Sequence, residues 1–422
     1  MKASESNSHY ASKVRECTNF AAREVKKVCA NIGPRPSGEE GEKKAQDYVE
    51  NLMAPIADEV KREKFSLHPK AFMGWVLVDG VMMLISAALM ILALSGAVPA
   101  VAVALKALAT VLSVVSLVFL LGEFLFYKQI MDPFFPKRES SNVLCVRKAS
   151  GETKKRIILA GHIDSAYEWR YTHLGGGKLL TSVIIAGIGA LVLSLIIDVL
   201  SFFDLGSIAN IVLIAVQCLT VPGFVLVLFF VNWKMCVDGA NDNLTGVFAS
   251  MAVLKYLKDN DIRFENTEVV AMSTGCEEAG LRGAKAFAKA HSKEYKDSGV
   301  ETVFMAVDTL RDYDYMGVYN KDMTGTVKLD AQAAEMVKKA CENAGYDIPF
   351  ASVFFGSSDA AAAQQGGIKS VALAAMDPAP ARYYHTRGDT ADNLDIKTFE
   401  AGIKIMLETV FLFDEQGLCD KY

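Results

Sequence analysis

The sequence lacks paired cysteines. Its eight cysteines form no CxxC pair and no dense framework; they are Cys17, Cys29, Cys145, Cys218, Cys236, Cys276, Cys341 and Cys419. This scatter favours free thiols in a reducing compartment over a disulfide scaffold. The N-terminal segment MKASESNSHYASKVREC has no apolar core of the kind found in signal peptides, so we do not expect a cleaved secretory signal.

A basic stripe, an internal repeat and a low-complexity segment are also lacking. With a net formal charge of −5, the lack of a basic stripe argues against a nucleic-acid partner. Apolar residues, by contrast, are abundant. The chain is 51% hydrophobic, which is more than an ordinary soluble enzyme carries. This excess indicates membrane segments.

Four long apolar runs account for the excess. They are Phe72–Leu94, Ala107–Phe126, Leu179–Leu200 and Ile208–Val231. Each has about 20 residues or more, which is enough for a helix to cross a hydrocarbon layer about 30 Å thick. Buried core helices are the alternative, but such helices seldom stay apolar for so long. Trp75 and Trp233 lie near ends of these runs, where interfacial aromatic residues are common.

The runs form two pairs with short links, SGAVPAVAVALK and SFFDLGS, so each pair is expected to be a transmembrane hairpin. Everything outside the hairpins then lies on one side of the membrane. Basic residues gather near the membrane ends on that side: Lys61, Arg62, Lys64, Lys70, Lys128, Lys137, Arg138, Arg170, Lys178 and Lys234. The far-side links hold only Lys106. The positive-inside rule therefore predicts a multi-pass membrane protein whose large polar part is cytoplasmic.

The rest of the chain is predicted to be one α/β domain that is interrupted twice. Its segments are 1–70, 129–178 and 234–422, and the hairpins occupy 71–128 and 179–233. Residues around 9–31 have an amphipathic helix pattern. Five strand-like segments follow, at 141–147, 156–161, 267–273, 301–307 and 370–375. Strands that alternate with helices predict a mainly parallel sheet covered on both faces.

Polar residues collect just after these strands. His162 and Asp164 follow one strand, Glu277 and Glu278 follow another, and Asp308 follows a third. His385 comes somewhat after the last strand, and Asp242 lies at an expected helix N-terminus. In an open α/β sheet, ligands bind at the carboxyl ends of the strands. We therefore expect these side chains to converge on one edge of the sheet.

Each residue alone has a simpler explanation. Asp242 could cap its helix, His162 could be a hydrogen-bonded surface or core histidine, and the glutamate pair could be a solvated loop. Together, two histidines and several carboxylates form a mixed nitrogen and oxygen ligand set suited to Zn²⁺ or a similar divalent ion. In His-x-Asp, Asp164 could fix the tautomer of a metal-bound His162.

The motifs GHIDS, DNLTG, GCEEAGLRG, VD and YYHTRGDT resemble, in this order, those of the zinc aminopeptidase and glutamate carboxypeptidase family, which includes bacterial leucyl aminopeptidase. IGPRPSGEEGEKKAQDYV and SSNVLCVR also match the opening helix and early strand of that family. The resemblance covers the soluble portion from about Ile32 to Phe411 and excludes the four apolar runs. It implies an α/β/α sandwich around a mostly parallel mixed sheet, with four transmembrane helices inserted as two hairpins.

The resemblance also implies a role for each site residue. Two zinc ions, or other divalent metals, are expected. His162 and Asp308 would hold one ion, His385 and Glu278 the other, and Asp242 would bridge both. Glu277 would be the general base, Asp164 would support His162, and Tyr384 would help to stabilise the tetrahedral oxyanion.

The expected function is therefore that of a membrane-anchored dinuclear zinc exopeptidase, and an aminopeptidase in particular. Three alternatives remain open. Arg382 and Arg387 flank His385 and could bind a substrate carboxylate, as a carboxypeptidase requires. A glutaminyl cyclase-like enzyme would use a single zinc and lack an equivalent of His162. A receptor or scaffold would have the same fold without a working centre. The expected partners are a peptide substrate and the lipid bilayer; the oligomeric state is left open.

Three features depart from the family pattern or go beyond it. Ala360 and Ala361 stand where bulkier residues are common, which concerns the substrate pocket. Asn243 begins a formal glycosylation sequon, but its place beside a bridging ligand makes modification improbable. Asp79 and Glu123 lie within apolar runs. They could pair or line a substrate path, but we expect them to snorkel to the nearby interface.

The second hairpin constrains the location of the centre. From Val231 to Asp242 is 11 steps along the sequence, and even a fully extended chain of that length reaches only ~36–40 Å. The metal centre is thus expected close to the bilayer surface. Substrates released at or near the membrane and simple anchoring of the enzyme are two interpretations that the sequence does not separate.

Overall fold

The computed structural model describes residues 1–353 and 355–422. The chain divides into two units. The α/β unit comprises Met1–Pro69, Lys137–Tyr167 and Met235–Tyr422, and the helical unit comprises Lys70–Pro136 and Glu168–Lys234. Each unit is therefore assembled from segments that are distant in the sequence.

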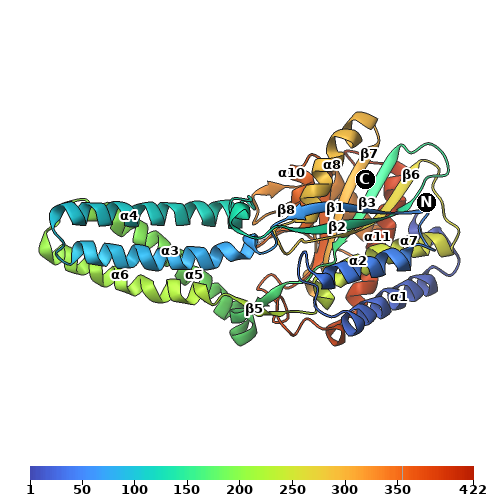
Figure 1. Ribbon diagram of the computed structural model, residues 1–422. Coiled ribbons are helices and arrows are strands. Elements are labelled where there is room, and N and C mark those ends of the chain that lie inside the picture. Colours follow the sequence, from blue (N-terminus) through green and yellow to red (C-terminus); the bar gives the residue numbers. More distant parts are fainter. Residues whose placement is uncertain (354) are drawn as a thin grey trace. The chain divides into compact units, whose positions relative to one another are not determined.

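The α/β unit is built on a nine-stranded mixed sheet (Figure 1). Its strands are β1 (Glu59–Leu67), β2 (Arg138–Arg147), β3 (Lys155–His162), β6 (Thr267–Thr274), β7 (Glu301–Leu310), β8 (Met316–Asp322), β9 (Val327–Lys328), β10 (Phe350–Ser352) and β11 (Lys369–Ala375). The order is β1-β2-β6-β3-β7-β11-β8-β10, and β9 pairs with β8. The four central strands, β6, β3, β7 and β11, run parallel. Their carboxyl ends therefore meet at one edge.

Helices cover both faces of this sheet. The helices are α1 (Tyr10–Asn31), α2 (Glu40–Met53), α7 (Thr245–Asp259), α8 (Arg282–Ser298), α9 (Ala331–Asn343), α10 (Asp359–Gln365) and α11 (Ile396–Gln416). In Figure 1, α1, α2, α7 and α11 lie on one side of the sheet, and α8 and α10 lie on the other. This is the α/β/α sandwich expected from the sequence.

Alternating strand residues explain why both faces are covered. Ile157 and Leu159 of β3 are fully buried in the main apolar cluster together with Phe248 of α7. Phe304 of β7 points to the opposite face, where its ring centroid lies 6.2 Å from that of Phe287 in α8. Burial of each such side chain contributes about 1.5–3 kcal/mol. The parallel strands are thus apolar on both sides, as a doubly covered sheet requires.

The helical unit contains four long helices (Figure 1). They are α3 (Ala71–Leu94), α4 (Pro99–Phe119), α5 (Arg170–Ser201) and α6 (Gly206–Leu228), and a short π-helix (Leu120–Leu125) extends α4. Among the described residues, four helices are long and apolar enough to cross a membrane. Strand β4 (Tyr167–Trp169) directly precedes α5, and strand β5 (Val231–Cys236) closely follows α6. The two strands pair with each other as a separate two-stranded sheet.

Two details differ from the sequence expectation for these helices. Helix α5 begins nine residues before the predicted apolar run and includes Gly176, whose φ of 67° interrupts the helical geometry. Lys106, which was expected in the link between the first two runs, lies inside α4 and donates a hydrogen bond to the Ser201 carbonyl at the end of α5, at 2.5 Å. A cation at a helix C-terminus is favourable because it meets the negative end of the helix dipole.

Acidic residues inside the helical unit do not snorkel. Asp79 is 8% exposed and Glu123 is fully buried, so that expectation is wrong. The Glu123 carboxylate accepts a hydrogen bond from the Met131 backbone at 2.6 Å and thereby anchors the segment that follows α4. Asp198 of α5, which the sequence analysis did not single out, is buried as well. Apolar runs indicate that a helix is buried or membrane-spanning, but the packing of neighbouring helices decides which way its acids point.

Candidate metal centre

The candidate centre lies at the carboxyl ends of the parallel strands. His162 is the last residue of β3, Glu277 comes three residues after the end of β6, and Asp308 is near the end of β7. His385 follows β11 after a longer loop. All four come from the α/β unit, and the order β6-β3-β7-β11 brings them to one edge. The structure therefore gathers the residues that the sequence analysis selected.

Close backbone packing brings Asp242 to the same edge. A Cβ on Gly161 of β3 would lie 2.4 Å from the Val247 nitrogen at the start of α7. A Cβ on Gly246 would lie 2.1 Å from the Val307 carbonyl oxygen of β7. Only glycine allows approaches this close, so the turn that carries Asp242 packs directly against both strands.

One group of possible ligands consists of His162, Asp242 and Asp308, which offer atoms within 4.8 Å of one another. His162 Nε2 lies 3.1 Å from Asp242 Oδ1 and 4.0 Å from Asp308 Oδ1. Ligand atoms around one tetrahedral zinc, each about 2.0–2.2 Å from the ion, lie roughly 3–4 Å apart. The three side chains thus have the spacing of ligands to a common ion.

A second group consists of Asp242, Glu278 and His385. His385 Nε2 lies 3.1 Å from Asp242 Oδ2 and 3.3 Å from Glu278 Oε1. Asp242 therefore presents one carboxylate oxygen to each histidine. Its alternative role as the cap of α7 is not seen, since Leu244 occupies the N-cap position of that helix.

Glu277 lies close to the first group. Its Oε2 is 3.8 Å from His162 Nε2, and it forms a third possible ligand group with His162 and Glu278. The glutamate pair is thus not a solvated loop, because the Glu277 side chain is 10% exposed and that of Glu278 is 11% exposed.

The pKa values of the buried residues show that this cluster needs compensating positive charge. Burial raises the pKa of Glu277, with the charge of His162 acting against this and that of Glu278 adding to it. Burial, followed by the Asp242 charge, raises the pKa of Asp308 to about 7. Burial alone would lower the pKa of His385, but the neighbouring Glu278 and Asp242 carboxylates raise it to about 10. Crowded buried carboxylates need protons or cations to compensate their charge, and the mixed donor set fits divalent zinc.

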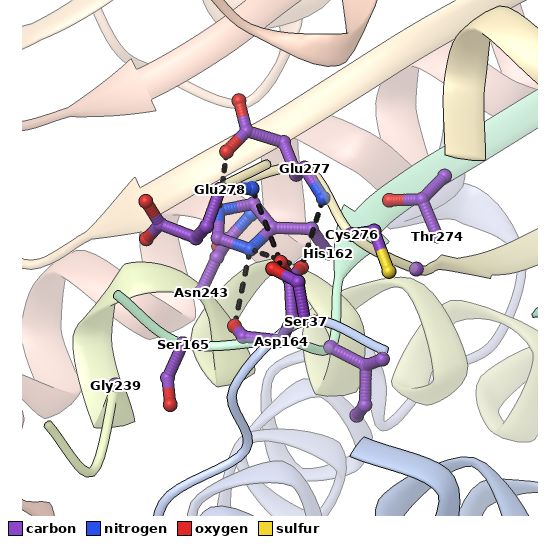
Figure 2. A network of polar contacts seen from close by, with 12 residues as sticks. Ser37, His162, Asp164, Ser165, Gly239, Asn243, Thr274, Cys276, Glu277 and Glu278 are labelled. Carbon is purple, nitrogen blue, oxygen red and sulfur yellow. Dashed lines mark hydrogen bonds and ion pairs between the residues drawn. The ribbon is translucent and has the colours of Figure 1, made fainter. Parts of the chain in front are cut away.

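Asp164 contacts both His162 and the backbone of the glutamate pair. It accepts hydrogen bonds from the backbone nitrogens of Glu277 and Glu278 at 3.0 and 3.1 Å and from the Ser37 hydroxyl at 2.6 Å. His162 Nδ1 lies 3.4 Å from its carboxylate and 3.3 Å from its backbone oxygen. Figure 2 shows these contacts around Asp164. One buried carboxylate thus contacts both His162 and the turn that carries the two glutamates.

Sequence reasoning missed two residues that hold the Asp242 turn. Asp389 accepts hydrogen bonds from the backbone nitrogens of Asn241 and Asp242 at 2.8 and 3.0 Å. Asn243 donates to the Val307 carbonyl at 2.8 Å and accepts from the Thr309 nitrogen at 3.2 Å. Asn243 is 1% exposed, so its sequon is not available to a glycan. The only signal for Asp389 was its place within the YYHTRGDT motif.

Glu42 of α2 is another missed residue. It accepts hydrogen bonds from the backbone nitrogens of Cys276 and Gly38 at 2.8 and 2.7 Å and from the Ser140 hydroxyl at 2.9 Å. Cys276 has a φ of +56°, which is uncommon for a side chain with a Cβ. Glu42 therefore holds the residue just before Glu277 in this backbone conformation. Its acceptor role depends on segments far away in the sequence, and its only signal was its place within IGPRPSGEEGEKKAQDYV.

The remaining candidates lie around His385. The Tyr384 ring stacks on the His385 ring with centroids 3.9 Å apart and an interplanar angle of 24°. Arg382 and Arg387 are exposed. Ala360 and Ala361 of α10 are fully buried. Small residues at these two positions therefore serve close packing of α10.

Solved structures of similar fold are zinc enzymes and glutaminyl cyclases. A zinc-dependent exopeptidase from Parabacteroides distasonis has a TM-score of 0.55 and 14% identity over 93% of this chain and 97% of its own. The zinc aminopeptidase of Bacillus subtilis has a TM-score of 0.53 and 14% identity, with coverage of 93% and 94%. The glutaminyl cyclase of Fimbriiglobus ruber has a TM-score of 0.56 and 13% identity, with coverage of 94% and 95%. No curated protein sequence matches the chain.

The fold is thus shared with zinc-dependent exopeptidases, and the site offers groups of possible metal ligands. Residues 225–410 match the model of peptidase family M28. This match covers somewhat less than half of the chain and agrees with the family that the sequence motifs resemble.

Proposed function

We propose that this protein is a membrane-anchored aminopeptidase with two zinc ions. The observation that carries the proposal is the position of Asp242, whose two oxygens each lie 3.1 Å from a different histidine. A carboxylate shared in this way suits a bridging ligand. His162 and Asp308 would complete one zinc site, and Glu278 and His385 would complete the other.

Two zinc ions, when bound, supply Lewis-acid polarisation of the scissile carbonyl and lower the pKa of the attacking water. The protein's own residues do the rest. Glu277 is proposed as the general base that accepts the proton of this water, since its carboxylate is buried beside His162. Asp164 holds the backbone of Glu277 and keeps the His162 ring oriented. Tyr384, stacked on His385, is proposed to steady the oxyanion of the tetrahedral intermediate.

The test is a screen of amino-acid amides and dipeptides against their N-acetylated forms, combined with metal analysis of the purified protein. We expect hydrolysis of substrates with a free amino terminus, two zinc ions per chain and loss of activity with a chelator. Cleavage that requires a free carboxyl terminus instead would contradict the aminopeptidase assignment and favour a carboxypeptidase.

A glutaminyl cyclase-like activity is the second candidate, because structures of that class share the fold with similar TM-scores. Its separate signature is one zinc per chain together with conversion of N-terminal glutamine to pyroglutamate. The metal count therefore separates the two candidates independently of the substrate screen.

We also propose that segments 71–128 and 179–233 anchor the enzyme as two transmembrane hairpins, with the catalytic segments 1–70, 129–178 and 234–422 in the cytoplasm. Exposed aliphatic side chains on α5 and α6, such as Ile185 (65% exposed), Ile208 (80%) and Leu219 (76%), support a lipid-facing surface. The distribution of lysine and arginine supports the orientation.

Cysteine labelling tests the orientation. Ser95→Cys, in the exposed link after α3, is expected to react with a membrane-impermeant maleimide in intact cells. Lys137→Cys, also at an exposed position, should react only after permeabilisation. Labelling of the wild-type chain measures the reaction of its own cysteines and is subtracted from that of each variant. The reverse pattern would place the catalytic segments outside the cytoplasm.

A further inference from the structure

A single buried arginine connects the chain segments on either side of the second hairpin. Arg35 is 0% exposed. Its Nε donates to the Ile163 carbonyl at 2.6 Å, Nη1 to the Asp238 carbonyl at 2.6 Å, and Nη2 to the Gly239 carbonyl at 3.0 Å. Nη1 also donates to the Gly33 carbonyl at 2.9 Å. Every acceptor is a backbone oxygen, so the guanidinium orders three stretches of main chain.

The stretches that Arg35 joins lead directly to proposed metal ligands. Ile163 lies between His162 and Asp164, and Gly239 comes three residues before Asp242. Between these two stretches the chain departs through residues 168–234, which belong to the other unit. His162 and Asp242 therefore sit at the exit and re-entry points of a long insertion, yet their ligand atoms lie 3.1 Å apart.

Further contacts around Arg35 hold the segment after His162 against the segment before Asp242. The Arg35 backbone nitrogen donates to the Ser165 hydroxyl at 2.9 Å, and the Ser165 hydroxyl donates to the Val237 carbonyl at 2.8 Å. A Cβ on Gly239 would lie 2.7 Å from the Ser165 Cβ and 3.0 Å from Arg35 Nη2. Figure 2 shows Ser165 and Gly239 beside the candidate centre. The segments 163–165 and 237–239 are thus held against each other by Arg35 and Ser165.

We propose that Arg35 is a positioning residue that fixes the distance between His162 and Asp242 across the inserted hairpin. The proposal rests on the zinc centre of the proposed function. A guanidinium suits this task because its planar fork donates in several fixed directions, whereas a lysine offers one point charge on a flexible stem. The carboxylates of Asp164 and Asp389 interact favourably with its charge, which helps to compensate its burial.

The test compares zinc affinity in the full-length protein and its Arg35→Lys and Arg35→Met variants, measured by competition with a chromogenic chelator. We expect zinc binding about 10–100-fold weaker in both variants, the range typical for loss of a group that orients metal ligands. Activity of Arg35→Lys should fall at limiting zinc and recover at saturating zinc. Should Arg35→Met not fold, the lysine variant, which keeps the charge, carries the comparison.

Arg147→Lys is the matched control. Arg147 is also buried and donates from Nε to a backbone carbonyl, that of Ile262, at 2.8 Å, but it lies on β2 and contacts none of the proposed ligands. Its variant should keep wild-type zinc affinity. A folded Arg35→Lys with wild-type affinity, or an equal loss in Arg147→Lys, would overturn the inference alone. A wild-type chain that binds no zinc would overturn the proposed function instead.

Discussion

Glu277→Gln is expected to lower kcat by about 10²–10⁴-fold while the protein keeps its zinc. Glutamine has nearly the same shape as glutamate but cannot accept the proton of the attacking water. Because Glu277 Oε2 lies 3.8 Å from His162 Nε2, the side chain is near enough to serve as a base or as a ligand. Retention of zinc in the variant separates these roles, and steady-state kinetics with metal analysis measures both.

Two other glutamate variants provide the comparison. Glu278→Gln removes a proposed ligand, so its zinc content should fall together with activity. Glu294→Gln, whose side chain is 71% exposed on α8, should leave both unchanged. If Glu277→Gln kept more than about a tenth of wild-type kcat, a role as general base would be ruled out.

The second large effect is expected from Asp242→Asn, which should abolish activity and lose both zinc ions. Asp242 belongs both to the group with His162 and Asp308 and to the group with Glu278 and His385. An amide presents one carbonyl oxygen where the carboxylate presents two. Metal analysis should give well under one zinc per chain. Asp322→Asn is the matched control. Asp322 is also a fully buried carboxyl, but it accepts its hydrogen bonds from Ser357, Ser358 and the Met323 backbone, so this variant should keep its zinc.

Removal of zinc from the wild type should also lower its stability. A ligand that binds only the folded state stabilises it by about 4 kcal/mol at a concentration 1,000 times its dissociation constant. Thiols buried in the α/β unit provide the readout: Cys17, Cys145, Cys276 and Cys341. A thiol-reactive dye should therefore report a lower melting temperature after chelation. Unchanged melting of the wild type would contradict a zinc-stabilised fold.

The effect of zinc on stability should grow with pH. In the metal-free chain the pKa of His385 is raised to about 10, so its stabilising contribution is complete below about pH 6.5 and is lost as the pH rises toward 10. The pKa of Asp308 is raised to about 7, so its ionisation costs more stability as the pH rises from about 4 to 7. Both changes weaken the metal-free protein at alkaline pH, whereas zinc binds the deprotonated ligands. The zinc-induced rise in melting temperature should thus be larger at about pH 8.5 than at about pH 6.5.

The proposed site residues were accessible to sequence analysis because each has a recognisable place in the chain. His162 and Asp308 end or nearly end apolar strands, and Glu277 and Glu278 follow another strand closely. Parallel strands place such positions at one edge of the sheet whatever their order. His385 lies farther along its loop and Asp242 precedes a helix, and the motifs around these two residues identified them.

The residues that hold the backbone around the site could not be selected from the sequence in the same way. Arg35, Glu42 and Asp389 act on backbone groups of segments that are far away in the sequence. Such contacts join segments that are remote along the chain, so no periodicity or spacing marks them. The inward direction of Asp79 and Glu123 is a similar case, since it depends on how the helices pack rather than on the apolar run that contains each acid.

The sequence by itself determined that an α/β sheet is interrupted by four membrane-length helices and which side chains gather at its carboxyl edge, because strand and helix periodicity and strand-end position are local properties. The tertiary structure supplied the geometry in which Asp242 faces both histidines, as the family resemblance had implied. It alone decided that Arg35 joins the two ends of an insertion. Those arrangements arise from backbone carbonyls, glycine contacts and buried charges that meet only when remote segments pack together.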